Sequence, residues 1–158
     1  MKKVLIIEDD KVLSEMYAIK LRKEGYEVKE SINGLEGLTC MGEFNPDVVL
    51  LDIMMPTMNG FETLEAIKHQ TSSHSKIIIF TNIVDKDKID LAMKSGADDY
   101  LIKANTNPSD VIEKINILLK KKDVINEPVY IKPGLNTFKM KNPLNPDEDI
   151  EISINIKI

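Results

Sequence analysis

The hydrophobic residues of this chain form short, uninterrupted apolar runs that alternate with amphipathic segments. An apolar run without polar alternation is typical of a strand buried on both faces, as in the middle of a parallel sheet. Such runs lie at residues 4–7, 48–51, 77–80 and 100–102, and residues 26–30 alternate as a shorter outer strand. The spacing of apolar positions between them predicts helices at residues 11–24, 34–43, 61–69, 86–94 and 107–122.

Strand and helix therefore alternate five times along the chain. Because crossovers between parallel strands are right-handed, this order predicts an α/β fold with a doubly wound five-stranded parallel sheet and helices on both faces. We expect the flavodoxin-like strand order 2-1-3-4-5, in which ligands bind at the carboxyl ends of the first and third strands. Residues 1–122 would form this domain, and residues 123–158 would be a short β-rich C-terminal extension.

The extension has its own pattern. A hairpin is predicted at residues 129–131 and 137–141, with a proline and glycine at 133 and 134 as its turn signal. From 150 to 158, isoleucine alternates with polar residues. That period of two places five isoleucines on one face. We expect a small β-meander that buries this face against the domain or against a second copy in a homodimer, and a disordered linker is the alternative.

Composition narrows the class of protein. The net charge is −5 and the only basic run is at residues 120–122, so we expect no direct nucleic-acid binding. No apolar run approaches the roughly 20 residues of a membrane span, and the start lacks the shape of a signal peptide. The single cysteine, Cys40, fits a reducing compartment. We therefore expect a cytoplasmic chain, and the lack of an apolar span predicts no membrane partner.

Acidic residues stand at the carboxyl ends of two predicted strands. Glu8 and Asp9 follow the first strand, and Asp52 follows the third. Three carboxylates at one sheet edge repel one another, and a hard cation would neutralise them. Since the donors are all oxygens, Mg²⁺ or Mn²⁺ suits them better than zinc.

A hydroxyl and an ammonium end the next two strands, at Thr81 and Lys103. A carboxylate nucleophile, a divalent cation, a hydroxyl and a lysine together can hold the oxygens of a phosphoryl group. The residues therefore favour phosphoryl chemistry at Asp52.

Four motifs carry a resemblance to a known family. They are residues 6–10 (IIEDD), 50–60 (LLDIMMPTMNG), 80–82 (FTN) and 96–103 (GADDYLIK). In this order they resemble the receiver domain of two-component response regulators, and the resemblance covers residues 1–122.

The resemblance implies a role for each site residue. Asp52 would accept a phosphoryl group from a histidine kinase or a phosphotransfer protein, in a Mg²⁺-dependent reaction. The metal ligands would be Glu8, Asp9, Asp52 and the backbone carbonyl of Met54. Thr81 and Lys103 would contact the phosphoryl group, and Tyr100 would be the switch aromatic. Such a protein signals to a downstream protein target and is a phosphoacceptor rather than an enzyme.

Two positions depart from the family pattern. Ala104 stands where a proline, often in a cis bond, usually follows the lysine, so we expect a trans bond. Asn82 replaces a small residue and would either narrow access to the site or add a hydrogen bond.

The residues alone leave two other classes of protein as alternatives. A Mg²⁺-dependent α/β phosphohydrolase would also use Asp52 as its nucleophile, but Met54 cannot supply its general acid. A flavin mononucleotide carrier would need a hydroxyl-rich phosphate loop after the first strand, where this chain has acids.

Overall fold

The computed structural model describes residues 1–69, 74–123, 134–142 and 145–156. The chain divides into two compact units, Met1–Asp123 and Val124–Ile158. No helix in the described ranges is long and apolar enough to cross a membrane.

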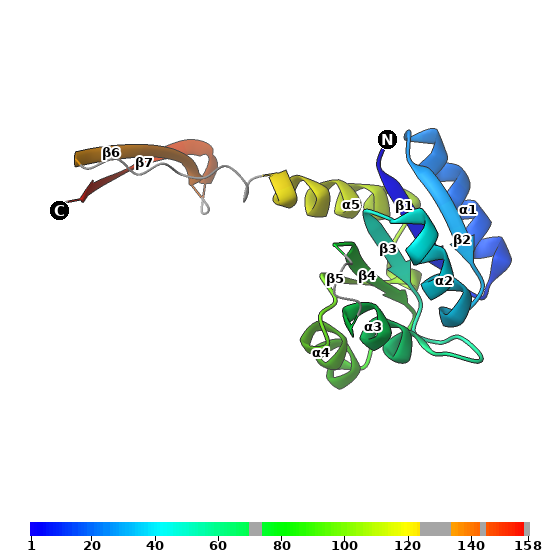
Figure 1. The fold of residues 1–158 in the computed structure, drawn as a ribbon. Coiled ribbons are helices and arrows are strands. Elements are labelled where there is room, and N and C mark those ends of the chain that lie inside the picture. Colours follow the sequence, from blue (N-terminus) through cyan, green and yellow to red (C-terminus); the bar gives the residue numbers. More distant parts are fainter. Residues whose placement is uncertain (70–73, 124–133, 143–144, 157–158) are drawn as a thin grey trace. The chain divides into compact units, whose positions relative to one another are not determined.

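The first unit is built on a five-stranded parallel sheet in the order β2-β1-β3-β4-β5 (Figure 1). The strands are β1 (Lys3–Ile7), β2 (Glu27–Ser31), β3 (Val48–Leu51), β4 (Lys76–Thr81) and β5 (Asp99–Ile102). The predicted fold class and strand order are confirmed.

The helices alternate with these strands. They are α1 (Lys11–Lys23), α2 (Gly34–Phe44), α3 (Gly60–His69), α4 (Lys86–Lys94) and α5 (Pro108–Asp123), with a short 3₁₀ helix η1 (Lys103–Asn105) after β5. Local chemistry fixes several of these starts. The Asp10 carboxylate accepts the N–H groups of Val12 and Leu13 at the start of α1, as an N-cap residue does.

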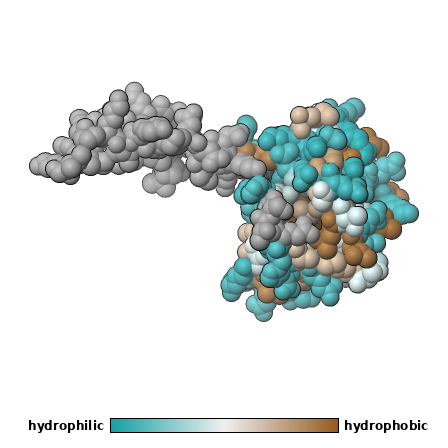
Figure 2. Space-filling model, in the orientation of Figure 1, coloured by the Kyte–Doolittle hydropathy of each residue, from teal (hydrophilic) through white to brown (hydrophobic). Residues whose placement is uncertain are grey.

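Alternate residues of each strand face opposite sides of the sheet and meet different helices. Val4 and Ile6 pack in the layer that includes Leu21 of α1 and Ile115 of α5. Leu5 and Ile7 pack on the other side, in a layer formed with α2, α3 and α4. The central strands are therefore covered on both faces, which explains why their sequences lack polar alternation. Hydrophilic residues cover much of the outer surface that Figure 2 shows.

The loop after β3 is held close to the sheet by Gly60. Its N–H donates to the carbonyl of Ile53 at 3.0 Å, and a Cβ built on Gly60 would lie 2.1 Å from the Asp52 carbonyl oxygen. Only a glycine fits this approach of α3 to the backbone that follows β3.

The described part of the second unit is an antiparallel hairpin of β6 (Gly134–Asn142) and β7 (Asn145–Ile156). The predicted strands at 137–141 and 150–156 are confirmed, and they pair with each other. The predicted strand at 129–131 and Ile158 lie outside the described residues.

The close approach at Gly60 predicts a stability difference between two glycine-to-alanine variants. Gly60→Ala should lower the free energy of unfolding by about 2 kcal/mol or more, because the new methyl group meets backbone that cannot move aside easily. In α2, a Cβ on exposed Gly42 would have no neighbouring atom within 4 Å, so Gly42→Ala should raise that free energy by about 0.5–1 kcal/mol. Urea unfolding followed by circular dichroism measures both. Equal effects of the two substitutions would contradict this account of the loop.

Candidate phosphoacceptor and metal site

Strand register brings the three acidic residues together. Ile7 at the end of β1 pairs with Leu51 at the end of β3, and the Asp52 N–H donates to the Ile7 carbonyl at 3.0 Å. One carboxylate oxygen from each of Glu8, Asp9 and Asp52 lies within 4.8 Å of the others. Glu8 and Asp52 are buried and Asp9 is exposed, so the cluster is open to solvent on the side of Asp9.

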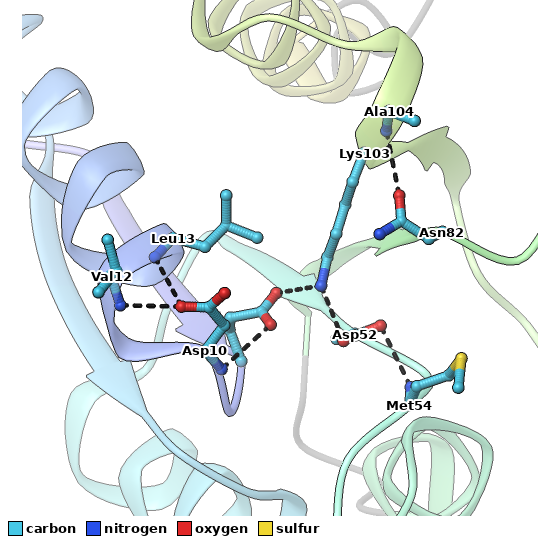
Figure 3. Close-up of polar contacts among 9 residues, drawn as sticks. Asp10, Val12, Leu13, Asp52, Met54, Asn82, Lys103 and Ala104 are labelled. Atoms are coloured by element: carbon cyan, nitrogen blue, oxygen red, sulfur yellow. Dashed lines mark hydrogen bonds and ion pairs between the residues drawn. The ribbon is translucent and has the colours of Figure 1, made fainter.

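Lys103 reaches across from the end of β5 into this cluster. Its ammonium lies 2.5 Å from Glu8 Oε2 and 2.8 Å from Asp52 Oδ2. Figure 3 shows Lys103 extending to Asp52. The three side chains are at most 10 % exposed, so water screens these ion pairs little.

Burial and charge act against each other on these groups. Burial raises the pKa of the Glu8 carboxyl above its ordinary value, although the hydrogen bond and charge of Lys103 act to lower it. Burial alone would lower the pKa of the Lys103 ammonium, but the hydrogen bonds and charges of Asp52 and Glu8 outweigh burial and raise it. Lys103 is therefore held as a cation beside the carboxylates.

The charge balance of the site favours a divalent cation. When ionised, the three carboxylates carry three negative charges and Lys103 offsets one, which leaves a surplus of two. A hard divalent ion such as Mg²⁺ or Mn²⁺ matches both this surplus and the oxygen-only donor set. The residues present therefore fit the predicted metal.

Thr81, the last residue of β4, has a buried side-chain hydroxyl. The residue is fully buried, and Oγ1 has no hydrogen-bond partner among the residues that the structure describes. A buried hydroxyl without a partner costs about 1–3 kcal/mol. Since Thr81 pairs with Ile102, next to Lys103, the hydroxyl belongs to the same sheet edge as the ammonium.

Tyr100 extends from β5 toward the loop after β4. Its hydroxyl donates to the Ile83 carbonyl at 2.7 Å, and the ring is half-buried. Burial raises the pKa of the Tyr100 hydroxyl, and the charges of Asp52 and Asp85 add to the effect. The tyrosine thus remains a hydrogen-bond donor that ties β5 to this loop.

Met54 contributes backbone rather than side chain to the site. Its N–H donates to Asp52 Oδ1 at 3.2 Å, while its side chain is exposed. Asp10, by contrast, is occupied with capping α1, and its N–H donates to Glu8 Oε1 at 3.3 Å. The Asp10 carboxylate is therefore not one of the three grouped donors, although the Asp10 backbone contacts Glu8.

The two departures from the family pattern lie in contact with each other. The Lys103–Ala104 peptide bond is trans, as expected. Asn82 adds a hydrogen bond, because its Oδ1 accepts the Ala104 N–H at 3.1 Å (Figure 3). The sequence left the effect of Asn82 open, and the one signal that could have indicated this bond is the backbone N–H of Ala104, which a proline at that position would lack.

Comparison with known proteins identifies the family. The chain matches the response regulator receiver domain family over residues 4–116 and belongs to it. The DNA-binding response regulator MtrA of Mycobacterium tuberculosis (strain ATCC 25618 / H37Rv) is 34% identical over 122 residues, which are 77% of this chain and 52% of MtrA. The DNA-binding dual master transcriptional regulator RpaA of Synechocystis sp. is 32% identical over 130 residues, which are 79% of this chain and 52% of RpaA.

Solved structures agree with this assignment. A CheY-like receiver domain protein from Methanospirillum hungatei JF-1 is 31% identical with a TM-score of 0.73, over 78% of this chain and 98% of that one. Chemotaxis protein CheY4 of Vibrio cholerae is 29% identical with a TM-score of 0.69, over 74% of this chain and 98% of that one. The chain is thus a receiver domain protein of two-component systems, and the phosphohydrolase and flavin alternatives are not supported.

The relatives also bear on the expected partners. The chain spans about half the length of the curated relatives it matches, and several of these are named as DNA-binding. The expectation that this chain has no nucleic-acid partner therefore finds no support in them.

The buried ion pairs predict a large effect of removing the ammonium. Lys103→Met should lower the free energy of unfolding by about 3 kcal/mol in the absence of divalent cations, because Glu8 and Asp52 stay buried without a countercharge. Added Mg²⁺ should restore part of this loss through binding to the folded state. The control is Lys76→Met, whose pair with Asp98 is more exposed and should cost about 1 kcal/mol or less, with no response to Mg²⁺. Similar losses in both variants, with or without the ion, would contradict this role of Lys103 as the countercharge of Glu8 and Asp52.

Proposed function

We propose that Asp52 accepts a phosphoryl group from the phosphohistidine of a histidine kinase or a phosphotransfer protein. The observation that carries this proposal is the placement of Asp52 itself. Its buried carboxylate pairs with Lys103 through Oδ2, accepts the Met54 N–H through Oδ1, and lies within 4.8 Å of donor oxygens of Glu8 and Asp9. A carboxylate with these neighbours has both the nucleophilic oxygen and the countercharges that phosphoryl transfer requires.

Each residue of the site then has a task. Glu8, Asp9, Asp52 and the Met54 carbonyl would hold Mg²⁺, which when bound neutralises charge on the phosphoryl oxygens. An Asp52 oxygen forms the new bond to phosphorus as the bond from phosphorus to the donor nitrogen breaks. The Lys103 ammonium and the Thr81 hydroxyl pair with phosphoryl oxygens on the other side.

The structure also suggests how phosphorylation is converted into a signal. Thr81 gains a hydrogen-bond partner when a phosphoryl oxygen arrives, which removes the cost of its buried hydroxyl. Motion of the loop after Thr81 carries the Ile83 carbonyl with it, and Tyr100 is bonded to that carbonyl. Phosphorylation thus shifts a two-state equilibrium of the surface formed by α4, β5 and α5, and this surface contacts a downstream protein.

With Asp52 as the acceptor, the protein acts as a phosphoacceptor and not as an enzyme with turnover. We place it in the cytoplasm, since its single cysteine fits a reducing compartment.

Replacement of the acceptor carboxylate tests the proposal. Asp52→Asn should abolish labelling by Mg²⁺ and acetyl phosphate, measured as an added phosphate mass in the intact protein, because a carboxamide oxygen is a poor nucleophile. Asp10→Asn is a matched control, since asparagine still caps α1 and Asp10 lies outside the cluster. It should label with the stoichiometry of the wild type. Labelling of Asp52→Asn at that same stoichiometry would mean that another residue accepts the phosphoryl group.

We further propose that the β6–β7 hairpin joins two copies of the chain in a homodimer. The register pairs Ile152 with Phe138 and Ile150 with Met140, whereas Lys139 opposes Glu151 on the alternate positions. The sequence pattern and this register thus put apolar residues opposite each other at these two pairs of positions and oppositely charged residues opposite each other at the alternate pair. A two-stranded hairpin alone is only marginally stable, and a second copy of the same apolar face would complete a small core.

Two neighbouring substitutions in β7 separate the two faces of the hairpin. Ile152→Lys places a charge on the apolar face and should convert the dimer into a monomer, while Ser153→Lys on the other face should leave it dimeric. Light scattering coupled to gel filtration gives the mass of each variant and of the wild type. A monomeric wild type, or equal behaviour of the two variants, would rule out this interface.

A further inference from the structure

The hydrogen bond between Asn82 and Ala104 joins the loops that follow β4 and β5. The backbone ladder between these strands ends at the pair Thr81 and Ile102. Beyond that pair, Asn82 Oδ1 accepts the Ala104 N–H at 3.1 Å (Figure 3). A side chain therefore extends the connection between the two strands past the point where the sheet stops.

Ala104 needs this acceptor because of its place in η1. The first N–H groups of a helix have no partner within the helix and are usually satisfied by an N-cap side chain. Here the N-cap position is Ile102, which makes no side-chain hydrogen bond. Asn82, distant in sequence, supplies the missing acceptor, and its oxygen must be the bonded atom because a backbone N–H can only donate.

The two bonded residues directly follow the two groups that are placed to receive phosphoryl oxygens. Asn82 follows Thr81, and Ala104 follows Lys103. The Lys103 ammonium is fixed by Glu8 and Asp52, but these contacts hold only the far end of a flexible side chain. The bond from Asn82 fixes the backbone from which that side chain starts.

We propose that Asn82 is a positioning residue. By fixing the backbone beside Lys103, it determines which oxygens the Lys103 ammonium can contact during phosphorylation of Asp52. This inference rests on the proposed phosphoacceptor function. When Asp52 becomes an acyl phosphate, the ammonium must exchange a carboxylate oxygen for a phosphoryl oxygen. A backbone anchored through Asn82 keeps the ammonium within range of both, and it does so without a proline after the lysine.

The expected effect on the rate of phosphorylation is moderate. Loss of one hydrogen bond between partly solvated groups corresponds to a slowing of about three- to tenfold if the bond is strongest in the transition state. Mg²⁺ affinity should not change, because Asn82 contacts none of Glu8, Asp9 and Asp52 in the described hydrogen bonds and ion pairs.

The test compares Asn82→Ala with Val84→Ala in the full chain. Val84 lies in the same loop, is exposed and makes no contact with η1 that the structure describes, so its truncation is a matched control. Acetyl phosphate serves as donor at saturating Mg²⁺; an Asp52 oxygen bonds to phosphorus as the bond from phosphorus to the acetyl oxygen breaks, releasing acetate. Both substitutions are repeated in a Lys103→Ala background, and Mg²⁺ affinity is measured by calorimetry.

If Asn82 acts through Lys103, Asn82→Ala slows phosphorylation about three- to tenfold with unchanged Mg²⁺ affinity, and the effect disappears once Lys103 is alanine. A rate equal to that of Val84→Ala would overturn the proposal. So would an equal slowing with and without the lysine, because Asn82 would then act by another route.

Nuclear magnetic resonance of the unphosphorylated protein separates this proposal from the function on which it rests. Asn82→Ala should speed hydrogen exchange of the Ala104 amide and shift the Lys103 ammonium resonance, whether or not the chain accepts phosphate. If the wild type fails to label but both changes are seen, the phosphoacceptor function fails while the positioning of Lys103 stands. If neither change is seen, the positioning role fails.

Discussion

The mutual repulsion of three carboxylates at one sheet edge is the constraint on which the rest of the site depends. Glu8, Asp9 and Asp52 come within 4.8 Å of one another, and two of them are buried. Such a cluster is stable only with positive charge beside it. Lys103 supplies one charge, and the negative surplus that remains is one that a divalent cation would neutralise.

The fold meets this constraint through the geometry of a doubly wound sheet. Parallel strands place their carboxyl ends on the same edge, and the order β2-β1-β3-β4-β5 sets β1 beside β3, so two acidic loops meet. The two apolar layers on either side of the sheet fix the strands in this register. Gly60 then lets α3 approach the backbone that follows β3, which shapes the loop that begins with Asp52.

Much of this arrangement could be predicted from the sequence because it depends on period and order. Fully apolar runs identified the buried strands, and the residues that follow them identified the acidic edge. What the sequence could not supply was distance across the sheet. Three features depend on strand register and side-chain rotamer. They are the contact of Lys103 with Glu8 as well as Asp52, the burial of the Thr81 hydroxyl without a described partner, and the bond of Asn82 to Ala104. For the same reason the sequence predicted a meander that includes the β7 strand but not the register in which β7 pairs with β6.

A structure of the chain with Mg²⁺ and beryllofluoride, which mimics a phosphoryl group on a carboxylate, would show whether Asp52 is the phosphoacceptor. We expect a beryllofluoride group on Asp52, a metal ion between Glu8, Asp9 and Asp52, and the Thr81 hydroxyl and Lys103 ammonium bonded to fluorine atoms. Crystals in which Asp52 stays unmodified at saturating beryllofluoride, with Lys103 still bridging Glu8 and Asp52 and Thr81 unmoved, would contradict it.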